Sequence, residues 1–143
     1  MKLLSDVNVL LTLTSNRCRQ HAAARGWWEN LPPAESLCIC RPVQTSLLRL
    51  LCTEAVMGED AITLPQAWSV YAQLLASGRF HFVLEPPKLD PTWADFCRPF
   101  GRSPKIVMDA YLAAFAVAGG YRLVTLDKAF SQFKGLDWEC PAP

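Results

Sequence analysis

Three aspartates occupy positions that suit the binding of a divalent cation. Asp6 stands between two short apolar runs, Asp127 directly follows the apolar run LVTL, and Asp109 is the fourth residue of the alanine-rich run IVMDAYLAAFAVA. A carboxylate flanked by apolar residues is costly to bury unless it is paired, protonated or bound to a metal. Where such groups meet, their repulsion favours protonation or a cation, and oxygen ligands suit Mg²⁺ or Mn²⁺. The competing interpretation is that Asp6 simply caps a helix.

The elements around these aspartates predict that they share one rim of a sheet. Residues 2–4 and 123–126 are expected to be buried strands, because their apolar residues do not alternate with polar ones. Asp6 and Asp127 then follow the carboxyl ends of parallel strands, where α/β proteins collect ligands. A helix over residues 106–118 spans about 20 Å and places Asp109, near its beginning, at the same rim. A metal bound there could orient a water for attack on a phosphodiester.

The rest of the chain alternates predicted helices and strands. Further strands are expected at 36–40, 81–84 and 136–138, helices at 7–13, 17–30, 42–53, 64–77, around Trp93 and Phe96, and just before Phe133, and loops at 58–63 and 97–105. This alternation predicts one α/β domain, residues 1–143, with a mainly parallel sheet of four to five strands.

Other polar side chains are candidates for completing the site. Gln44 lies at a predicted strand-to-helix corner and could face the same crevice as Asp6. The loop at 97–105 contains no acid, and it carries Arg98, Arg102 and Lys105. It is the best local candidate for contacting a phosphate backbone, with ordinary solvated charge as the alternative.

Composition restricts the class of protein. The 143 residues are 51% hydrophobic, which predicts a folded globule, and 14 basic against 13 acidic residues produce no strong global field. No segment has the roughly 18 apolar residues of a membrane span, and no signal-peptide core is present, so a cytoplasmic protein with reduced cysteines is expected. The spacing of Cys38 and Cys40 disfavours a zinc site. His21 is interpreted as a packing or surface histidine.

Taken together, these motifs resemble those of PIN-domain proteins, specifically the VapC-type toxin ribonucleases of bacterial type II toxin–antitoxin systems. The matching pieces are LLSDVNVLLTL around Asp6, RPVQTSLLRLL around Gln44 and Arg49, MDAYLAAFAVAGG around Asp109, and LVTLDKAF around Asp127. Their order and spacing cover nearly the whole chain. The combination is specific, although each piece alone is weak.

The resemblance implies a PIN fold, an α/β/α sandwich on a parallel sheet. It also implies Mg²⁺- or Mn²⁺-dependent endoribonuclease activity on structured RNA such as tRNA or rRNA, growth inhibition, a homodimer and a cognate VapB-type antitoxin. Asp6, Asp109 and Asp127 match the family's acidic positions and would hold the metal. The family's second acid, commonly a glutamate at the start of the third helix, falls on Gln44.

Two supporting roles and several alternatives complete the prediction. Thr125 could hydrogen-bond a carboxylate or a metal-bound water, and Arg49 is expected to pair structurally with an acid. Because Gln44 carries no charge, the chain could instead be a catalytically weak RNA-binding or interaction module. An aspartate-nucleophile phosphatase would need a second acid two residues after Asp6, where this chain has Asn8. The absence of a glycine-rich phosphate loop argues against a nucleotide-binding Rossmann protein.

Overall fold

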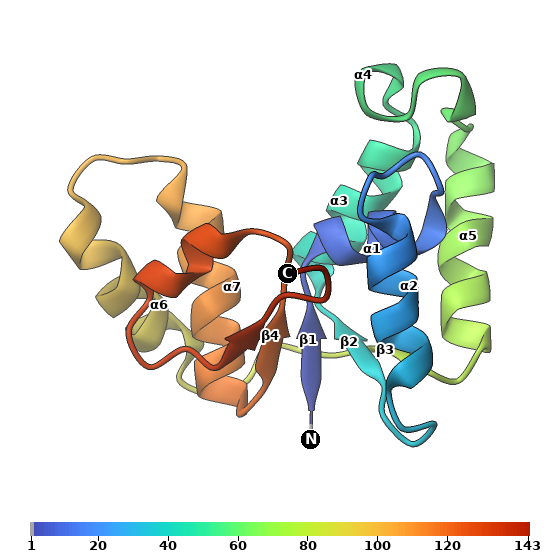
Figure 1. The fold of residues 1–143 in the computed structure, drawn as a ribbon. Helices are drawn as coiled ribbons and strands as arrows, with labels where there is room; N and C mark the ends of the chain where they lie inside the picture. The colour runs from blue at the N-terminus through green and yellow to red at the C-terminus, as the bar shows by residue number, and fades with distance from the viewer. Residues whose placement is uncertain (1) are drawn as a thin grey trace.

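The computed structural model describes residues 2–143, which form a parallel five-stranded sheet flanked by helices (Figure 1). The strands are β1 (Leu3–Ser5), β2 (Leu37–Ile39), β3 (Phe80–Phe82), β4 (Arg122–Val124) and β5 (Trp138–Glu139). Their order across the sheet is β3-β2-β1-β4-β5, and each neighbouring pair is parallel. The predicted α/β class with a mainly parallel sheet is therefore confirmed.

Two groups of helices flank this sheet. The helices are α1 (Val7–Thr14), α2 (His21–Asn30), α3 (Arg41–Leu51), α4 (Glu54–Met57), α5 (Leu64–Ala76), α6 (Leu89–Cys97) and α7 (Ile106–Gly119). In Figure 1, α6 and α7 lie to the left of the sheet and α1, α2, α3 and α5 to the right. On the left α6 packs against α7, and on the right α3 packs against both α1 and α5. No helix within residues 2–143 is both long and apolar enough to span a membrane.

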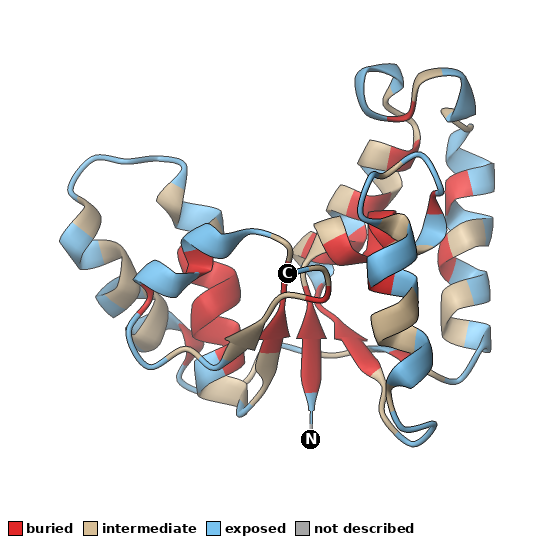
Figure 2. Ribbon diagram, viewed as in Figure 1, coloured by how far each residue is buried: buried red, intermediate tan, exposed pale blue. Residues whose placement is uncertain are grey.

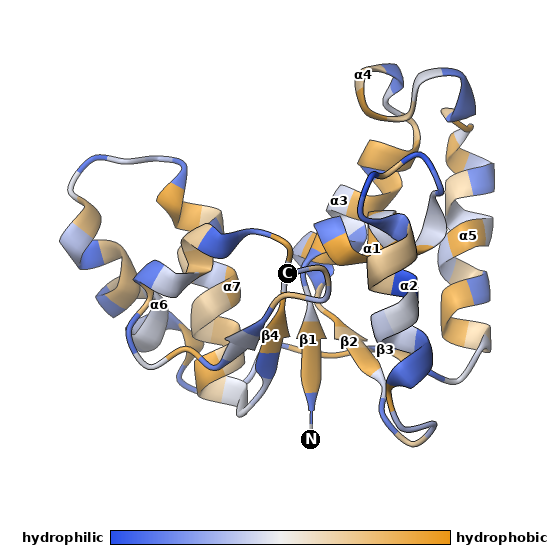
Figure 3. Cartoon of the chain, viewed as in Figure 1, coloured by the Kyte–Doolittle hydropathy of each residue, from blue (hydrophilic) through white to orange (hydrophobic). Residues whose placement is uncertain are grey.

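The hydrophobic core lies on the central strands and on α7. All three residues of β1 and of β2 are buried, as Figure 2 shows, and Figure 3 shows that these central strands are mostly apolar. Uninterrupted apolar residues suit a strand that is covered on both faces. Seven successive residues of α7, from Ala110 to Ala116, are also buried. Four of them are alanines, whose small side chains let the helix approach both β4 and α6 closely.

The order of the strands creates a crevice beside Asp6. From β1 the chain builds β2 and β3 on one side, and it later adds β4 and β5 on the other. The carboxyl ends of β1 and β4 therefore flank a topological switch point, which is where α/β sheets bind ligands. The backbone N–H of Asp6 donates to the carbonyl of Val124 at 2.9 Å, which ties the start of α1 to the end of β4.

The structure corrects several predicted boundaries. Helix α2 begins at His21 rather than at residue 17, because the preceding segment forms turns, in which the N–H of Arg17 contacts the Ser15 hydroxyl at 3.3 Å. The predicted loop at 58–63 begins with a 3₁₀ turn, η1 (Gly58–Asp60), which directly follows α4. The loop at 97–105 likewise begins with η2 (Arg98–Phe100), where a proline in the first turn suits the helical backbone.

Candidate active site

Asp6 lies between β1 and α1, and its carboxylate is held by three hydrogen bonds. Its Oδ1 accepts from the backbone N–H of Val7 at 2.7 Å. Its Oδ2 accepts from the hydroxyl of Thr125 at 2.7 Å and from the side-chain amide of Asn8 at 3.2 Å. Asp6 is therefore the N-cap of α1, as the simpler interpretation expected, and it is also bonded across the sheet to the end of β4.

Thr125 is the hub of this network. It is fully buried, and besides donating to Asp6 its hydroxyl oxygen accepts from the backbone N–H of Asp127 at 3.0 Å. The amide nitrogen of Asn8 lies 3.4 Å from the same hydroxyl, while the Asn8 carbonyl oxygen accepts from the N–H of Leu126 at 3.1 Å. The side chains of Thr125 and Asn8 thus join the ends of β1 and β4. Sequence reasoning missed this role of Asn8, although its place two residues after Asp6 was a usable signal.

Asp127 lies three residues beyond β4, on the same rim. Its Oδ1 accepts from the N–H of Ala129 at 2.9 Å, so that Asp127 caps the 3₁₀ helix η3 (Lys128–Gln132). The residue is exposed to solvent. Its other carboxylate oxygen, Oδ2, accepts no hydrogen bond from any of the described residues.

Asp109 stands in the first turn of α7 and borders a cavity of about 250 Å³. Asp6 also lines this cavity, and Ser46 and Arg49 of α3 line it as well. The exposed thioether of Met108 forms part of its wall. The cavity is therefore an acidic hollow with one hydroxyl and one guanidinium at its α3 wall.

The three carboxylates interact electrostatically. Burial raises the pKa of Asp6, an effect that its hydrogen bonds from Thr125 and Val7 oppose and that the charge of Asp127 reinforces. Burial also raises the pKa of Asp109, with further increases from the charges of Asp127 and Asp6. Each shift means that the ionised form is disfavoured in the folded protein, so a bound cation would relieve the repulsion.

The donor set fits a hydrated hard cation. Within residues 2–143 no three His, Cys, Asp or Glu side chains are grouped closely enough to enclose a metal by themselves. Mg²⁺ commonly keeps several waters and binds through only one or two carboxylates. Asp6 and Asp109, which face one cavity, are the residues that could hold such an ion, and Asp127 adds negative charge at the rim.

Gln44 does not line this cavity. It is 5% exposed, and its Oε1 accepts from a guanidinium nitrogen of Arg41 at 2.6 Å. Both residues line a separate groove between α3 and α5. Residues two apart on a helix point about 200° away from each other, so Gln44 and Ser46 face different sides of α3. The position of α3 that faces the acids is therefore Ser46, which sequence reasoning missed and which its i, i+3 spacing from Val43 could have indicated.

Arg49 behaves differently from the expectation of a structural ion pair. It is exposed, and its guanidinium forms no ion pair with any of the described acids. It instead lines both the acidic cavity and the groove between α3 and α5. A guanidinium in this position is available to bind an anion.

The basic loop is only partly free. Arg98 pairs with Asp95 at 2.9 Å on an exposed surface, where such pairs contribute little stability. Arg102 and Lys105 are exposed and pair with none of the described acids. The loop leads directly into α7, so that Lys105 lies four residues before Asp109. Two of the three residues predicted to contact RNA, Arg102 and Lys105, are thus unpaired cations that shortly precede Asp109 in the sequence.

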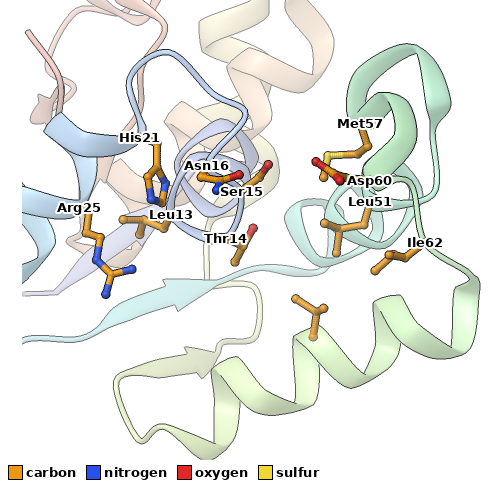
Figure 4. Close-up of a pocket in the computed structure, with 11 residues that line it drawn as sticks. Leu13, Thr14, Ser15, Asn16, His21, Arg25, Leu51, Met57, Asp60 and Ile62 are labelled. Carbon is orange, nitrogen blue, oxygen red and sulfur yellow. The ribbon is translucent and has the colours of Figure 1, made fainter.

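A larger hollow of about 520 Å³ lies elsewhere, where the ends of α1 and α3 meet α2 and η1 (Figure 4). Its one acid, Asp60, pairs with Arg17 at 3.4 Å. The Nδ1 of His21 lies 2.7 Å from the carbonyl oxygen of Thr12, which is consistent with the expected packing role. A single paired carboxylate does not provide a metal site, so the smaller acidic cavity is the better candidate for chemistry.

Comparisons with known proteins agree with this geometry. A family model described as the PIN domain matches residues 3–136. Ribonuclease VapC41 of Mycobacterium tuberculosis is 39% identical over 139 residues, which cover 94% of this chain and 95% of that relative. VapBC2 from Rickettsia felis, solved bound to a DNA fragment from its promoter, superposes with a TM-score of 0.73 at 16% identity, over 98% of both chains.

A second solved structure is VapC20 of Mycobacterium tuberculosis, described as a toxin that cleaves the sarcin–ricin loop. It superposes with a TM-score of 0.67 at 18% identity and covers 95% of this chain and 99% of its own. At these identities the two superpositions show the shared fold, whereas the family match and the 39% identity concern the sequence itself. The chain therefore belongs to the PIN-domain family and, within it, to the VapC-type toxin ribonucleases.

Proposed function

We propose that this protein is a Mg²⁺- or Mn²⁺-dependent endoribonuclease that acts as the toxin of a toxin–antitoxin system. The observation that carries the proposal is the convergence of Asp6 and Asp109 on one cavity, where the charge of Asp127 on the same rim raises the pKa of both carboxylates. Family membership supports ribonuclease chemistry, and the structured RNAs of translation, tRNA or rRNA, are the proposed substrates.

The residues of the site have distinct roles in this proposal. Asp6 and Asp109 hold the cation, which when bound supplies Lewis acidity and lowers the pKa of water. Thr125 fixes the direction of the Asp6 carboxylate through the bond of 2.7 Å. Asp127, which is exposed on the same rim, can accept the proton of the attacking water as the phosphodiester P–O bond breaks.

Cations beside the acidic cavity are proposed to position the RNA. Arg49 lines the cavity and can bind the phosphate next to the scissile bond. Arg102 and Lys105 lie further out, in the loop that precedes α7, where they can contact neighbouring phosphates. Because all three are exposed, an approaching RNA reaches them without rearrangement of the core.

The alternative of a catalytically weak RNA-binding module depended on Gln44. That side chain is buried against Arg41 and lines a different groove, so its lack of charge removes no ligand from the acidic cavity. No observation in the structure favours this alternative over the ribonuclease.

Two protein partners are also proposed. The fold is shared with proteins solved as VapBC complexes, which supports a cognate VapB-type antitoxin for this chain. A homodimer is supported by the groove between α3 and α5, where Leu64 is 60% and Trp68 52% exposed, because large exposed apolar groups mark interaction surfaces. Sedimentation of Trp68→Ser tests the dimer. We expect a monomer, whereas Val56→Ser on α4 should leave the sedimentation coefficient unchanged.

RNA cleavage by the purified protein tests the enzymatic proposal. Gel analysis of tRNA and rRNA fragments should show cleavage with Mg²⁺ or Mn²⁺, its loss in EDTA and its recovery when metal is restored. Asp6→Asn should lower cleavage by roughly 10²–10³-fold and relieve growth inhibition on expression. Cleavage that persists in EDTA, or an unaffected Asp6→Asn variant, would contradict the proposal.

A further inference from the structure

A hollow of about 380 Å³ lies between the beginning of the basic loop and the segment that follows η3. We call it the phenylalanine hollow, because Phe96, Phe100 and Phe133 all line it, with Pro99 beside them. The ring centroids of Phe96 and Phe100 lie 5.4 and 5.7 Å from that of Phe133, and both rings are tilted 56° to it. Phe133 is 3% exposed and forms the base of the hollow, while the other two rings are only half-buried.

Two chain segments connect this hollow to the candidate active site. Gln132, which lines the hollow, ends the 3₁₀ helix that Asp127 caps. A 3₁₀ helix of five residues spans about 10 Å at about 2.0 Å per residue. On the other side, the chain runs from Phe100 through the basic loop to Asp109 in the first turn of α7 (Figure 1). About three stacked nucleotides, at about 3.4 Å each, would span the distance of about 10 Å along the 3₁₀ helix.

The surroundings of the hollow are positively charged. Residues 97–105 carry Arg98, Arg102 and Lys105 without an acid, and Lys134 lines the hollow itself. The one carboxylate in the lining, that of Asp95, is paired with Arg98 at 2.9 Å. An aromatic hollow with a basic border matches the chemistry of single-stranded RNA, whose bases stack on aromatic rings while cations contact the phosphates. An apolar protein segment would use the rings but not the unpaired cations.

We propose that the phenylalanine hollow binds one unpaired nucleobase of the RNA substrate, a few nucleotides away from the scissile phosphate. The inference rests on the ribonuclease function proposed above. The base lies against Phe96 and Phe100, and Gln132, which also lines the hollow, can offer its amide to the polar edge of the base. The hollow then selects RNA in which the target phosphodiester has an unpaired neighbour at a defined spacing.

Binding measurements without metal test this assignment. The protein carries Asp6→Asn to prevent cleavage, and the probe is a fluorescently labelled single-stranded RNA oligomer, followed by anisotropy. Adding Phe100→Leu should weaken binding about tenfold, since stacking of one base contributes about 1–3 kcal/mol. Phe100→Tyr keeps a ring and should bind within about twofold of its parent. An oligomer of the same length whose nucleotides lack bases should not distinguish the variants, and the salt dependence should be unchanged.

Cross-linking provides a measurement that needs no mutation in the hollow. The same oligomer with a single 4-thiouridine, irradiated on the Asp6→Asn protein, should form adducts within residues 95–100 or 132–134. Adducts found only elsewhere would overturn the assignment, as would equal affinities of the Phe100→Leu and parent proteins. Either result would leave the hollow as a contact for an apolar protein side chain.

The outcomes separate this inference from the proposed function. If Phe100→Leu weakens RNA binding but the unmutated protein does not cleave RNA with Mg²⁺ or Mn²⁺, the nuclease proposal fails and the hollow stands as an RNA site. If the protein cleaves RNA and Phe100→Leu changes neither affinity nor cleavage, only the hollow is excluded.

Discussion

The two sides of the acidic cavity are built differently. On the side of β1 and β4, which we call the bonded side, the side chains of Asp6, Asn8, Thr125 and Asp127 all take part in hydrogen bonds. On the side of α3 and α7, the open side, Ser46, Arg49 and Asp109 line the cavity, and within residues 2–143 their side chains form no ion pair or hydrogen bond.

The difference shows which part of the site folding prepares in advance. The bonded side orients a carboxylate at the switch point of the sheet, and its hydrogen bonds offset part of the cost of burying that carboxylate. The open side holds its polar groups on helix backbones and leaves them free for a ligand. Preorganised groups on one side and unpaired groups on the other are what a site needs to orient a cation and then receive a phosphate.

The largest effect is expected from removing the charge of the bonded side. Asp6→Asn should lower RNA cleavage by roughly 10²–10³-fold, because the half-buried carboxylate that would hold the cation becomes a neutral amide. Single-turnover cleavage assays at saturating Mg²⁺ measure this loss. Asp60→Asn, which removes an exposed carboxylate from the larger hollow, should retain nearly full activity. Equal losses in both variants would show that the acidic cavity is not the site.

A smaller but still large effect is expected from the hub of the bonded side. Thr125→Val keeps the shape of the side chain but removes the hydroxyl that joins Asp6 to the N–H of Asp127. Cleavage should fall about 10- to 100-fold, and the free energy of unfolding by about 1–3 kcal/mol. Thr125→Ser keeps the hydroxyl, so it should recover most of the activity. Urea unfolding and cleavage assays together distinguish orientation of Asp6 from loss of the fold.

The open side can be tested by adding a charge. Ser46→Glu places a carboxylate on the face of α3 that lines the cavity, so it should tighten Mg²⁺ binding roughly tenfold. Gln44→Glu puts the same charge two residues away, beside Arg41 in the other groove, and should leave Mg²⁺ affinity unchanged. Isothermal titration calorimetry compares the two variants. Tighter binding in Gln44→Glu alone would mean that the family's second acid acts from that position.

The raised pKa of Asp6 predicts a dependence of stability on pH. Because the folded pKa lies above the unfolded value of 3.8, Asp6 contributes stability below pH 3.8 that is lost as the pH rises through the folded pKa. As the pH rises from 3.8 through the folded pKa, the Tm of the metal-free protein should therefore fall by a few degrees relative to the Tm of Asp6→Asn. Mg²⁺ should raise the Tm of the unmutated protein near neutral pH. A difference in Tm that does not vary with pH would contradict the raised pKa of Asp6.

The smallest effect is expected outside both sides of the cavity. Arg102→Ala removes one exposed cation from the basic loop, so RNA affinity should fall only about two- to threefold, with the slope of log K against log salt reduced by about 0.7. Arg98→Ala should change the slope less, because Arg98 already pairs with Asp95. Anisotropy titrations at several salt concentrations measure both slopes. An identical change in the two variants would show that the ion pair opens when RNA binds.

Much of the bonded side could be predicted from local sequence. Asp6 and Asp127 follow apolar runs that had to be buried strands, and parallel strands bring their carboxyl ends to one rim. The position of Asp109 followed from the length of α7. The open side was predicted poorly: Gln44 was expected to face the crevice, and Ser46 was not considered. Gln44 and Ser46 lie about 200° apart around the axis of α3. Which of the two faces the acids depends on how α3 is rotated about that axis, and its packing against α1 and α5 sets this rotation.

The sequence by itself determined the α/β class and the placement of the three aspartates at one rim, because both depend on the periodicity of apolar residues along short segments. Only the tertiary structure decided that Thr125 and Asn8 hold Asp6, that Ser46 and Arg49 line the cavity, and that Phe100 and Phe133 form one hollow. Except for the bond from Asn8 to Asp6, these contacts join residues that are far apart in the chain, or they depend on how one helix is rotated against its neighbours. Local spacing can point to a candidate such as Ser46 or Asn8, but it does not specify which residue elsewhere in the fold that candidate contacts.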